Sequence, residues 1–249
     1  MVDTIMNLNN YKILKNSFWA FIPARGSSKS IKLKNLVDIN GTKLISFTIN
    51  ILKKNHDIIS KIYCSTENKK IKNFCLKSNI YIDDRKKKLA LDSTCINDVI
   101  YDFLIKQVIK KKSIPEFIIL CEPTSPLLRS IDIQLCCNKI IKHKNLDSVQ
   151  TVTMVSPNSH AYNQRIVKRN LSSFFFKKER NSMYNKQMKP QFYIHGNLRV
   201  FRSASFLKYR NIFGKKSFCI KIPKLFAFDL DDKEDLEIFR IIQKKLSFK

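Results

Sequence analysis

A loop of small residues and cations follows the first strongly apolar segment of the chain. It reads Pro-Ala-Arg-Gly-Ser-Ser-Lys at 23–29, and Lys34 and Asn35 come shortly after. Gly and Ser let phosphate oxygens approach backbone N–H groups closely, while Arg and Lys supply positive charge. The composition is that of a triphosphate-binding loop, with Arg25 and Lys29 on one side and Lys34 on the other. Neither G-x-x-x-x-G-K-[ST] nor G-x-G-x-x-G spacing is present, so on its own the stretch could equally be a solvated basic turn.

Two aspartates near the other end of the chain have the spacing of a metal site. Asp229 and Asp231 stand two positions apart after the apolar stretch 225–228. In an extended chain their carboxylates project to the same side. Two such oxygen ligands, completed by phosphate oxygens and water, suit Mg²⁺. The alternative is that Asp231 caps a helix beginning near Asp232, because Asp is a favourable N-cap residue.

Polar residues also follow two expected strands in the middle of the chain. Ser65 and Thr66 either hydrogen-bond a base or ribose, or cap a helix that starts at Asn68. A turn with two prolines, 123–126, follows the strand expected at 117–121 and would hold its backbone in place before a ligand arrives.

Asp92 closes a polar segment that begins at Arg85. Its position favours an interpretation as the N-cap of a helix over 93–110.

Short runs rich in β-branched and aromatic residues predict strands at 18–22, 61–64, 117–121, 148–155 and 226–229. Segments with helical periodicity lie between most of them. This alternation predicts an α/β fold, with a mostly parallel sheet covered by helices on both faces. Ligands bind beyond the carboxyl ends of such strands, so the polar residues described above are expected to line one crevice.

Residues 157–190 interrupt this rhythm with Pro, Asn, Ser and the aromatic run 174–176. So many aromatic residues in an insertion predict that it packs against something, and a partner surface is preferred to an internal core. Residues 1–16 are interpreted as an N-terminal extension, and 17–249 as a single domain.

The composition bounds the classes of function. The net charge is +27, from 47 Lys+Arg against 20 Asp+Glu, but the excess is Lys spread along every segment. Such charge would attract an anionic substrate, and it is weak support for nucleic-acid binding. Seven cysteines without C-x-x-C spacing indicate reduced thiols and a cytoplasmic protein. No apolar run reaches the length of a membrane span, and the first sixteen residues contain no signal-peptide core, so export is not indicated.

Taken in order, the polar motifs resemble those of the acylneuraminate cytidylyltransferases, the CMP-sialic acid synthetase family. The resemblance covers about residues 17–245. The first motif is similar to the family's I-P-A-R-G-G-S-K-G followed by K-N, and the last to its D-x-D. The matching segments are 22–30 with Lys34 and Asn35, 65–67, 85–92, 123–127 with Arg129, and 229–231.

The resemblance implies a three-layer, Rossmann-like fold of the nucleotide-diphospho-sugar transferase type, with 157–190 as a protruding dimerisation arm in a homodimer. It implies a nucleotidyltransferase of sugar nucleotide biosynthesis that transfers CMP from CTP to the anomeric hydroxyl of a nine-carbon 2-keto sugar acid, releasing pyrophosphate. Arg25, Lys29 and Asp231 would be catalytic, and Asp229 with Asp231 would bind Mg²⁺. The residues implied to contact the substrates are Ala24, Gly26, Ser28, Lys34, Asn35, Ser65, Thr66, Glu122, Thr124, Ser125, Gln187 and Gly196.

The chain departs from the family pattern at several positions. Ser27 and Ser30 replace loop glycines, Glu67 replaces an Asp, and the region around Gly196 matches poorly. Glu122 replaces a Gln that lies near the sugar in relatives, so pseudaminic, legionaminic and octulosonic acids are alternative acceptors. A basic nucleic-acid-binding protein and an inactive relative are the remaining alternatives. The presence of every loop cation and both carboxylates argues against the inactive relative.

Overall fold

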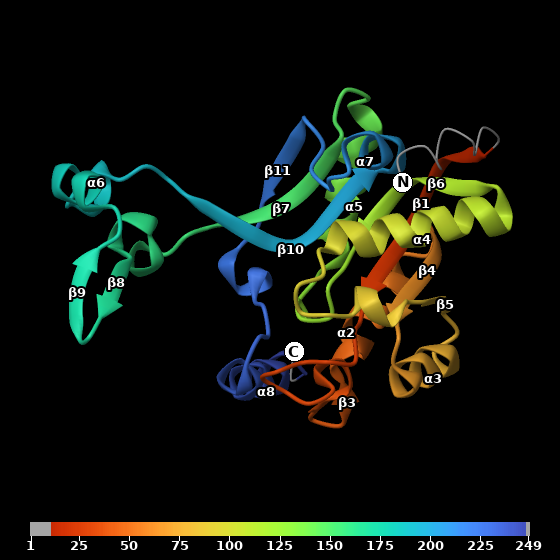
Figure 1. Ribbon diagram of the computed structural model, residues 1–249, viewed down its shortest axis with the longest axis horizontal. Coiled ribbons are helices and arrows are strands. Elements are labelled where there is room, and N and C mark those ends of the chain that lie inside the picture. The colour runs from red at the N-terminus through yellow and green to blue at the C-terminus, as the bar shows by residue number, and fades with distance from the viewer. Residues whose placement is uncertain (1–10, 248–249) are drawn as a thin grey trace.

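The computed structural model describes residues 11–247, which form a seven-stranded sheet between two layers of helices, with an arm projecting to one side (Figure 1). The sheet order is β11-β7-β10-β6-β1-β4-β5. β10 runs antiparallel to β6 and β7, while the other neighbouring pairs are parallel. The strands are β1 (Lys12–Pro23), β4 (Ile59–Thr66), β5 (Tyr81–Asp84), β6 (Ser113–Leu120), β7 (Ser148–Met154), β10 (Tyr193–Arg202) and β11 (Ser217–Lys221).

Helices cover both faces of this sheet, as the alternation of strands and helices predicts. One face carries α2 (Leu44–Lys54), α3 (Lys69–Lys77) and α5 (Ser130–Lys142), and the other carries α4 (Ile96–Lys111) and α7 (Ser203–Tyr209). The last helix, α8 (Lys233–Ser247), packs against a small hairpin of β2 (Asp38–Ile39) and β3 (Thr42–Lys43). The predicted α/β fold is confirmed.

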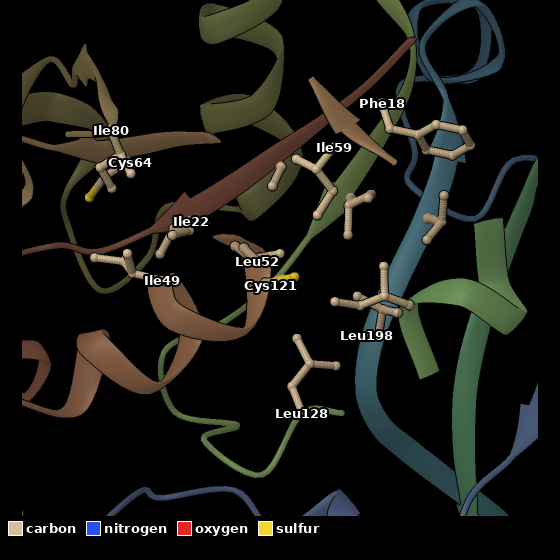
Figure 2. Close-up of a cluster of buried hydrophobic side chains, with 14 of the residues drawn as sticks. Phe18, Ile22, Ile49, Leu52, Ile59, Cys64, Ile80, Cys121, Leu128 and Leu198 are labelled. Atoms are coloured by element: carbon tan, nitrogen blue, oxygen red, sulfur yellow. The ribbon is translucent and has the colours of Figure 1, made fainter. Parts of the chain in front are cut away.

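The side chains of the central strand β1 alternate between the two faces of the sheet. Phe18 and Ile22 point to one face and join the cluster with α2 that Figure 2 shows, while Trp19 and Phe21 join Phe103 of α4 on the other face. All five side chains are almost fully buried. Because successive residues of a strand face opposite sides, a run that is apolar at every position is the pattern of a strand buried on both faces.

β1 begins at Lys12, five residues before the domain boundary predicted at residue 17. Ile13 and Leu14 pack on the core, so residues 12–16 belong to the sheet and the predicted boundary is wrong there. The remainder of the predicted extension, residues 1–10, lies outside the described residues.

The strand predicted at 226–229 is wrong. Residues Lys224–Ala227 form a short 3₁₀ helix that begins directly after Pro223, and the chain then runs without regular structure to Asp231. Proline fixes φ near the helical range and suits a first helical turn, which competes with the β-propensity of the aromatic residues that follow.

The predicted insertion is an arm. Beyond β7 and β10 it carries the hairpin β8 (Arg165–Lys168) and β9 (Leu171–Phe174), followed by α6 (Lys177–Ser182), and it stands away from the sheet (Figure 1). Leu171 and Phe175 are 78% and 60% exposed, whereas Phe176 packs on Tyr162 inside the arm. The protruding shape is as predicted, and pairing with a second copy stays a prediction.

Replacing Phe103 by Ala tests the layer between α4 and the sheet. Phe103 is fully buried and its ring lies 4.9 Å from that of Phe21 and 5.0 Å from that of Tyr63. The lost burial and the cavity left behind should lower the free energy of unfolding by about 3–5 kcal/mol. Ile109→Ala on the same helix is the control, because Ile109 is 63% exposed, and it should change stability by less than about 0.5 kcal/mol. Equal losses for the two variants in urea unfolding would contradict this packing.

Candidate active site

A cavity of about 320 Å³ opens beyond the carboxyl ends of β1, β5 and β6. It is lined by several residues that the sequence singles out: Arg25, Ser28, Lys34, Asn35, Glu122 and Thr124. Arg85 and Asp92 line it as well. The predicted crevice at the strand ends therefore exists, and cations from the first loop line it together with Glu122.

Arg25 and Lys29 are both engaged by Asp92. Arg25 Nη1 lies 2.6 Å and Lys29 Nζ 3.0 Å from the Asp92 carboxylate. Hydrogen bonds from Lys29 and Arg25 hold the pKa of Asp92 below its ordinary value of 3.8. The predicted capping role of Asp92 is wrong, because α4 starts only at Ile96 and no side chain caps it. Asp92 instead balances the loop cations.

The backbone of the loop is held by neighbouring polar groups. The Gly26 N–H donates to Glu67 Oε1 at 2.7 Å, and Asn35 Nδ2 donates to the Arg25 carbonyl at 2.9 Å. A Cβ on Gly26 would lie 2.5 Å from the side chain of Asn68, so only glycine fits. Gly26 and Asn35 thus shape the loop, while Ala24 is fully buried beneath it.

Ser65 and Thr66 are buried and turned inward. Ser65 Oγ donates to Asp83 at 2.7 Å and accepts from Arg85 Nε at 3.2 Å. Thr66 Oγ1 accepts from the N–H of Asn68, whose own side chain caps α3. Neither residue lines the cavity. Their contacts are internal, Asn68 rather than either of them caps α3, and Ser65 helps to hold Arg85, a cavity-lining cation absent from the predicted site.

The proline-bounded turn after β6 also contributes to the cavity wall. Glu122 and Thr124 line the cavity, whereas Ser125 is buried and donates its N–H to the Glu122 carbonyl at 3.1 Å. Burial raises the pKa of the Glu122 carboxyl, and Arg199, whose Nη1 lies 3.5 Å away, opposes that rise.

The acidic segment from the end of the chain reaches the first loop. Lys34 Nζ lies 3.3 Å from Asp231 Oδ1 and donates to the carbonyls of Leu230 and Asp231 at 3.1 and 3.0 Å. Ser30 Oγ also donates to the Asp231 carbonyl, at 2.5 Å. Residues almost 200 positions apart therefore meet at one place, as the metal-site interpretation requires.

Asp231 is not the cap of the last helix. Asp232 Oδ1 accepts from the N–H of Asp235, and Asp235 Oδ2 accepts in return from the N–H groups of Asp231 and Asp232. This reciprocal arrangement leaves the Asp231 carboxylate to Lys34. Burial raises the pKa of Asp229, a hydrogen bond with the Thr124 side chain opposes the rise, and the charge of Asp231 adds to it.

The donor set fits a magnesium ion shared with phosphate. Among residues 11–247 no group of three or more His, Cys, Asp or Glu side chains is arranged to hold a metal. Mg²⁺ commonly uses only one or two carboxylates and completes its octahedron with phosphate oxygens and water. Asp229 and Asp231 could supply those carboxylates, and the charge of Asp231 adds to the rise that burial causes in the pKa of Asp229.

Two predicted substrate contacts lie away from this cavity. Gln187 is exposed on the arm and lines a separate hollow of about 590 Å³ with Arg180 and Tyr184. Gly196 is buried in β10, where an added Cβ would lie 2.5 Å from Thr151 Oγ1, so the close approach it permits is to a neighbouring strand. The side-chain amide of the next residue, Asn197, donates hydrogen bonds to Asp132 and to the Phe226 carbonyl.

The fold and the cavity define a class, an α/β protein with a cation-lined cavity at the carboxyl ends of its parallel strands, where ligands of such folds bind. The chain matches the model of the cytidylyltransferase family over residues 19–247, and it belongs to that family.

Individual relatives are distant. An N-acylneuraminate cytidylyltransferase of Streptococcus agalactiae is 25% identical over 86% of this chain and 50% of its own length, so the chain spans about half of that relative. A pseudaminic acid cytidylyltransferase of Campylobacter jejuni is 23% identical over 90% of this chain and 94% of its own. A solved CMP:2-keto-3-deoxy-manno-octonic acid synthetase in complex with CTP superposes with a TM-score of 0.65 at 13% identity, over 92% of this chain and 99% of its own, which confirms the fold.

The pairing of the loop cations with Asp92 gives a direct test. Lys29→Met or Arg25→Met should raise the pKa of Asp92 toward 3.8, because each removes a hydrogen bond that stabilises the ionised form. Carbon NMR of the labelled carboxyl group, titrated with acid, measures this. Lys72→Met is the control, since Lys72 pairs with Asp84 at 2.6 Å, and it should leave Asp92 unchanged. An Asp92 that already titrates at its ordinary value in the unmodified protein would refute the pairing.

Proposed function

We propose that this protein transfers CMP from CTP to the anomeric hydroxyl of a sialic-type, nine-carbon 2-keto sugar acid. The observation that carries the proposal is the ion pair between Lys34 and Asp231 beside the cavity. It joins the cationic segment 23–35 to the acidic doublet, which is Asp229 and Asp231. The family match and the names of the relatives support a cytidylyltransferase acting on a keto-sugar acid.

The chain's own residues have distinct parts in this reaction. The anomeric oxygen attacks the α-phosphorus of CTP, the bond from that phosphorus to the bridging oxygen breaks, and pyrophosphate leaves. Arg25, Lys29 and Lys34 offset the charge that develops on the leaving group, so catalysis is mainly positioning and charge neutralisation. Since Arg25 and Lys29 hold Asp92 in the free protein, binding of the triphosphate exchanges one anion for another.

Asp229 and Asp231 are the residues that would hold Mg²⁺. Bound there, the ion would neutralise phosphate charge and lower the pKa of the attacking hydroxyl. Lys34 contacts both the carboxylate of Asp231 and its carbonyl, so it fixes the position of the doublet relative to the phosphate loop.

The rest of the proposal concerns the acceptor, the assembly and the location. Pseudaminic, legionaminic and octulosonic acids are the alternative acceptors, and the chemistry is the same for each. A homodimer formed through the arm is supported by the exposed Leu171 and Phe175. A cytoplasmic location is supported by five buried, unpaired cysteines. No helix within residues 11–247 has the length and apolar character needed to cross a membrane.

Pyrophosphate release tests the function. The purified protein, with CTP and each of the four sugar acids in turn, should release pyrophosphate with one of them and should need a divalent cation. Replacing CTP by ATP, GTP or UTP is the control for the nucleotide. Absence of release with every acceptor, together with salt-sensitive binding to DNA or RNA, would instead support the nucleic-acid alternative.

Asp231→Ala tests the doublet. Turnover should fall by at least about a hundredfold, because a group that stabilises transition-state charge is lost, while the thermal unfolding midpoint stays close to that of the unmodified protein. Glu237→Ala, which removes an exposed carboxylate from α8, is the matched control and should keep full activity. Unchanged pyrophosphate release by Asp231→Ala would end the metal assignment.

A further inference from the structure

A buried asparagine on β10 connects the sheet with the segment that leads to the acidic doublet. Asn197 is 2% exposed, and its side-chain amide donates to the Phe226 carbonyl at 2.9 Å and to Asp132 Oδ2 at 3.1 Å. Its Oδ1 accepts from Thr151 Oγ1 at 2.9 Å. Because both amide hydrogens are bonded, the side chain has one orientation, and it binds the Phe226 carbonyl at a fixed place.

Asp132, in the first turn of α5, holds this arrangement together. It is fully buried, and Arg129 binds both of its carboxylate oxygens, Nη2 to Oδ1 at 2.6 Å and Nε to Oδ2 at 3.1 Å. The Cζ atom of Arg129 also lies 3.9 Å from the centre of the Phe226 ring. Phe226 is thus held twice, through its carbonyl by Asn197 and through its ring by Arg129, and both of these side chains are bonded to Asp132.

The acidic doublet begins three residues beyond Phe226. Residues 228–230 form no helix or strand, so no regular backbone pairing positions Asp229. The next fixed point is Leu230, whose N–H donates to the Thr124 carbonyl at 2.8 Å. Asp229 therefore lies between an anchor at Phe226 and an anchor at Leu230, and its place beside Asp231 depends on both. Mg²⁺ requires near-ideal octahedral geometry, so a displaced carboxylate binds it poorly.

We propose that Asn197, Asp132 and Arg129 are positioning residues for the divalent cation, because they hold Phe226 and through it the Asp229 carboxylate. None of these three side chains lines the cavity, so they act on the ion only through the doublet. The inference rests on the proposed function, which assigns Asp229 and Asp231 as the residues that would hold Mg²⁺. Removal of such outer partners commonly weakens metal binding by about ten- to a hundredfold.

Hydrogen exchange of the ligand-free protein tests the anchor without catalysis or metal. The N–H groups of Phe226, Phe228 and Leu230 are all hydrogen-bonded to backbone carbonyls. Asn197→Ala removes the bond that holds the Phe226 carbonyl, so these amides should exchange about tenfold faster. Mass spectrometry of the peptide that covers residues 224–231 measures this.

Mn²⁺ tests the consequence for the cation. Water-proton relaxation reports binding of Mn²⁺–CTP to the protein with no acceptor present, and Asn197→Ala should weaken that binding about tenfold. Binding of CTP without metal should be unchanged, because Arg25 and Lys34 are intact. Arg129→Lys is a milder second variant that keeps a cation beside Asp132 but loses the planar contact with Phe226, and it should weaken Mn²⁺–CTP binding about threefold.

Asn55 offers a matched control. It is 1% exposed, and its side-chain amide donates to the Ile51 carbonyl at 2.8 Å and to Ser130 Oγ at 3.0 Å. Neither bond reaches the acidic segment. Asn55→Ala therefore removes a buried asparagine with the same number of donated bonds, and it should leave Mn²⁺–CTP binding and the exchange of residues 224–231 unchanged.

The outcomes separate the inference from the proposed function. Unchanged exchange or unchanged Mn²⁺–CTP binding in Asn197→Ala would overturn the inference, as would equal changes in Asn55→Ala, and the proposed function would stand. An unmodified protein that binds CTP but no Mn²⁺–CTP would overturn the metal assignment and the inference together. The expected exchange and Mn²⁺ results, without pyrophosphate release from any acceptor, would support the inference and overturn the proposed reaction.

Discussion

The contacts of Lys34 join the two ends of the chain, and the geometry of the site depends on them. The side chain is only 14% exposed, and its ammonium group is satisfied by the carbonyls of Leu230 and Asp231 and by the Asp231 carboxylate. Leu230 is itself fully buried and donates its N–H to the Thr124 carbonyl at 2.8 Å. Three segments that are distant in sequence are thus held together, and they place the acidic segment 229–231 beside the loop 23–29. Buried ammonium and amide groups leave little freedom here, because an alternative arrangement would leave polar groups unsatisfied.

This linkage brings groups of opposite charge together around the cavity. Arg25, Lys34, Arg85, Asp92 and Glu122 line it, and Asp231 is bound to Lys34 beside it. Neighbouring cations repel one another, and so do neighbouring carboxylates. Ion pairs reduce this repulsion: Asp92 pairs with Arg25 and Lys29, and Glu122 pairs with Arg199. The two pairings differ in their surroundings. Lys29 of the first is 86% exposed, so water and salt weaken that pair, whereas Arg199 and Glu122 of the second are 16% and 34% exposed.

The sequence predicted the layered fold and the crevice well, because both depend on local patterns. Apolar runs located β1, β4, β6 and β7, and the rule that ligands bind at the carboxyl ends of parallel strands placed Arg25, Lys34 and Thr124 together. Capping was predicted less well. Asp92 and Asp231 both had the local pattern of a cap, but each is held by a distant cation, and such long-range pairing leaves no signal within the neighbouring residues. Arg199 was missed for a similar reason, since only the insertion of β10 beside β6 brings it to Glu122.

The antiparallel strand β10 connects the arm with the site. It begins at Tyr193 as the chain leaves the arm, passes Gly196, which packs without a side chain on Thr151, and reaches Arg199 opposite Leu120 of β6. The register of β10 shifts against β7 between His195 and Arg199, the stretch that contains Gly196 and Asn197. Since a slip of one residue turns every side chain to the opposite face, Asn197 and Gly196 together set the face on which Arg199 projects. The contacts of Gly196 and Asn197 are therefore structural: they hold β10 in register, and the guanidinium of Arg199, two positions further along, lies beside Glu122 at the edge of the cavity.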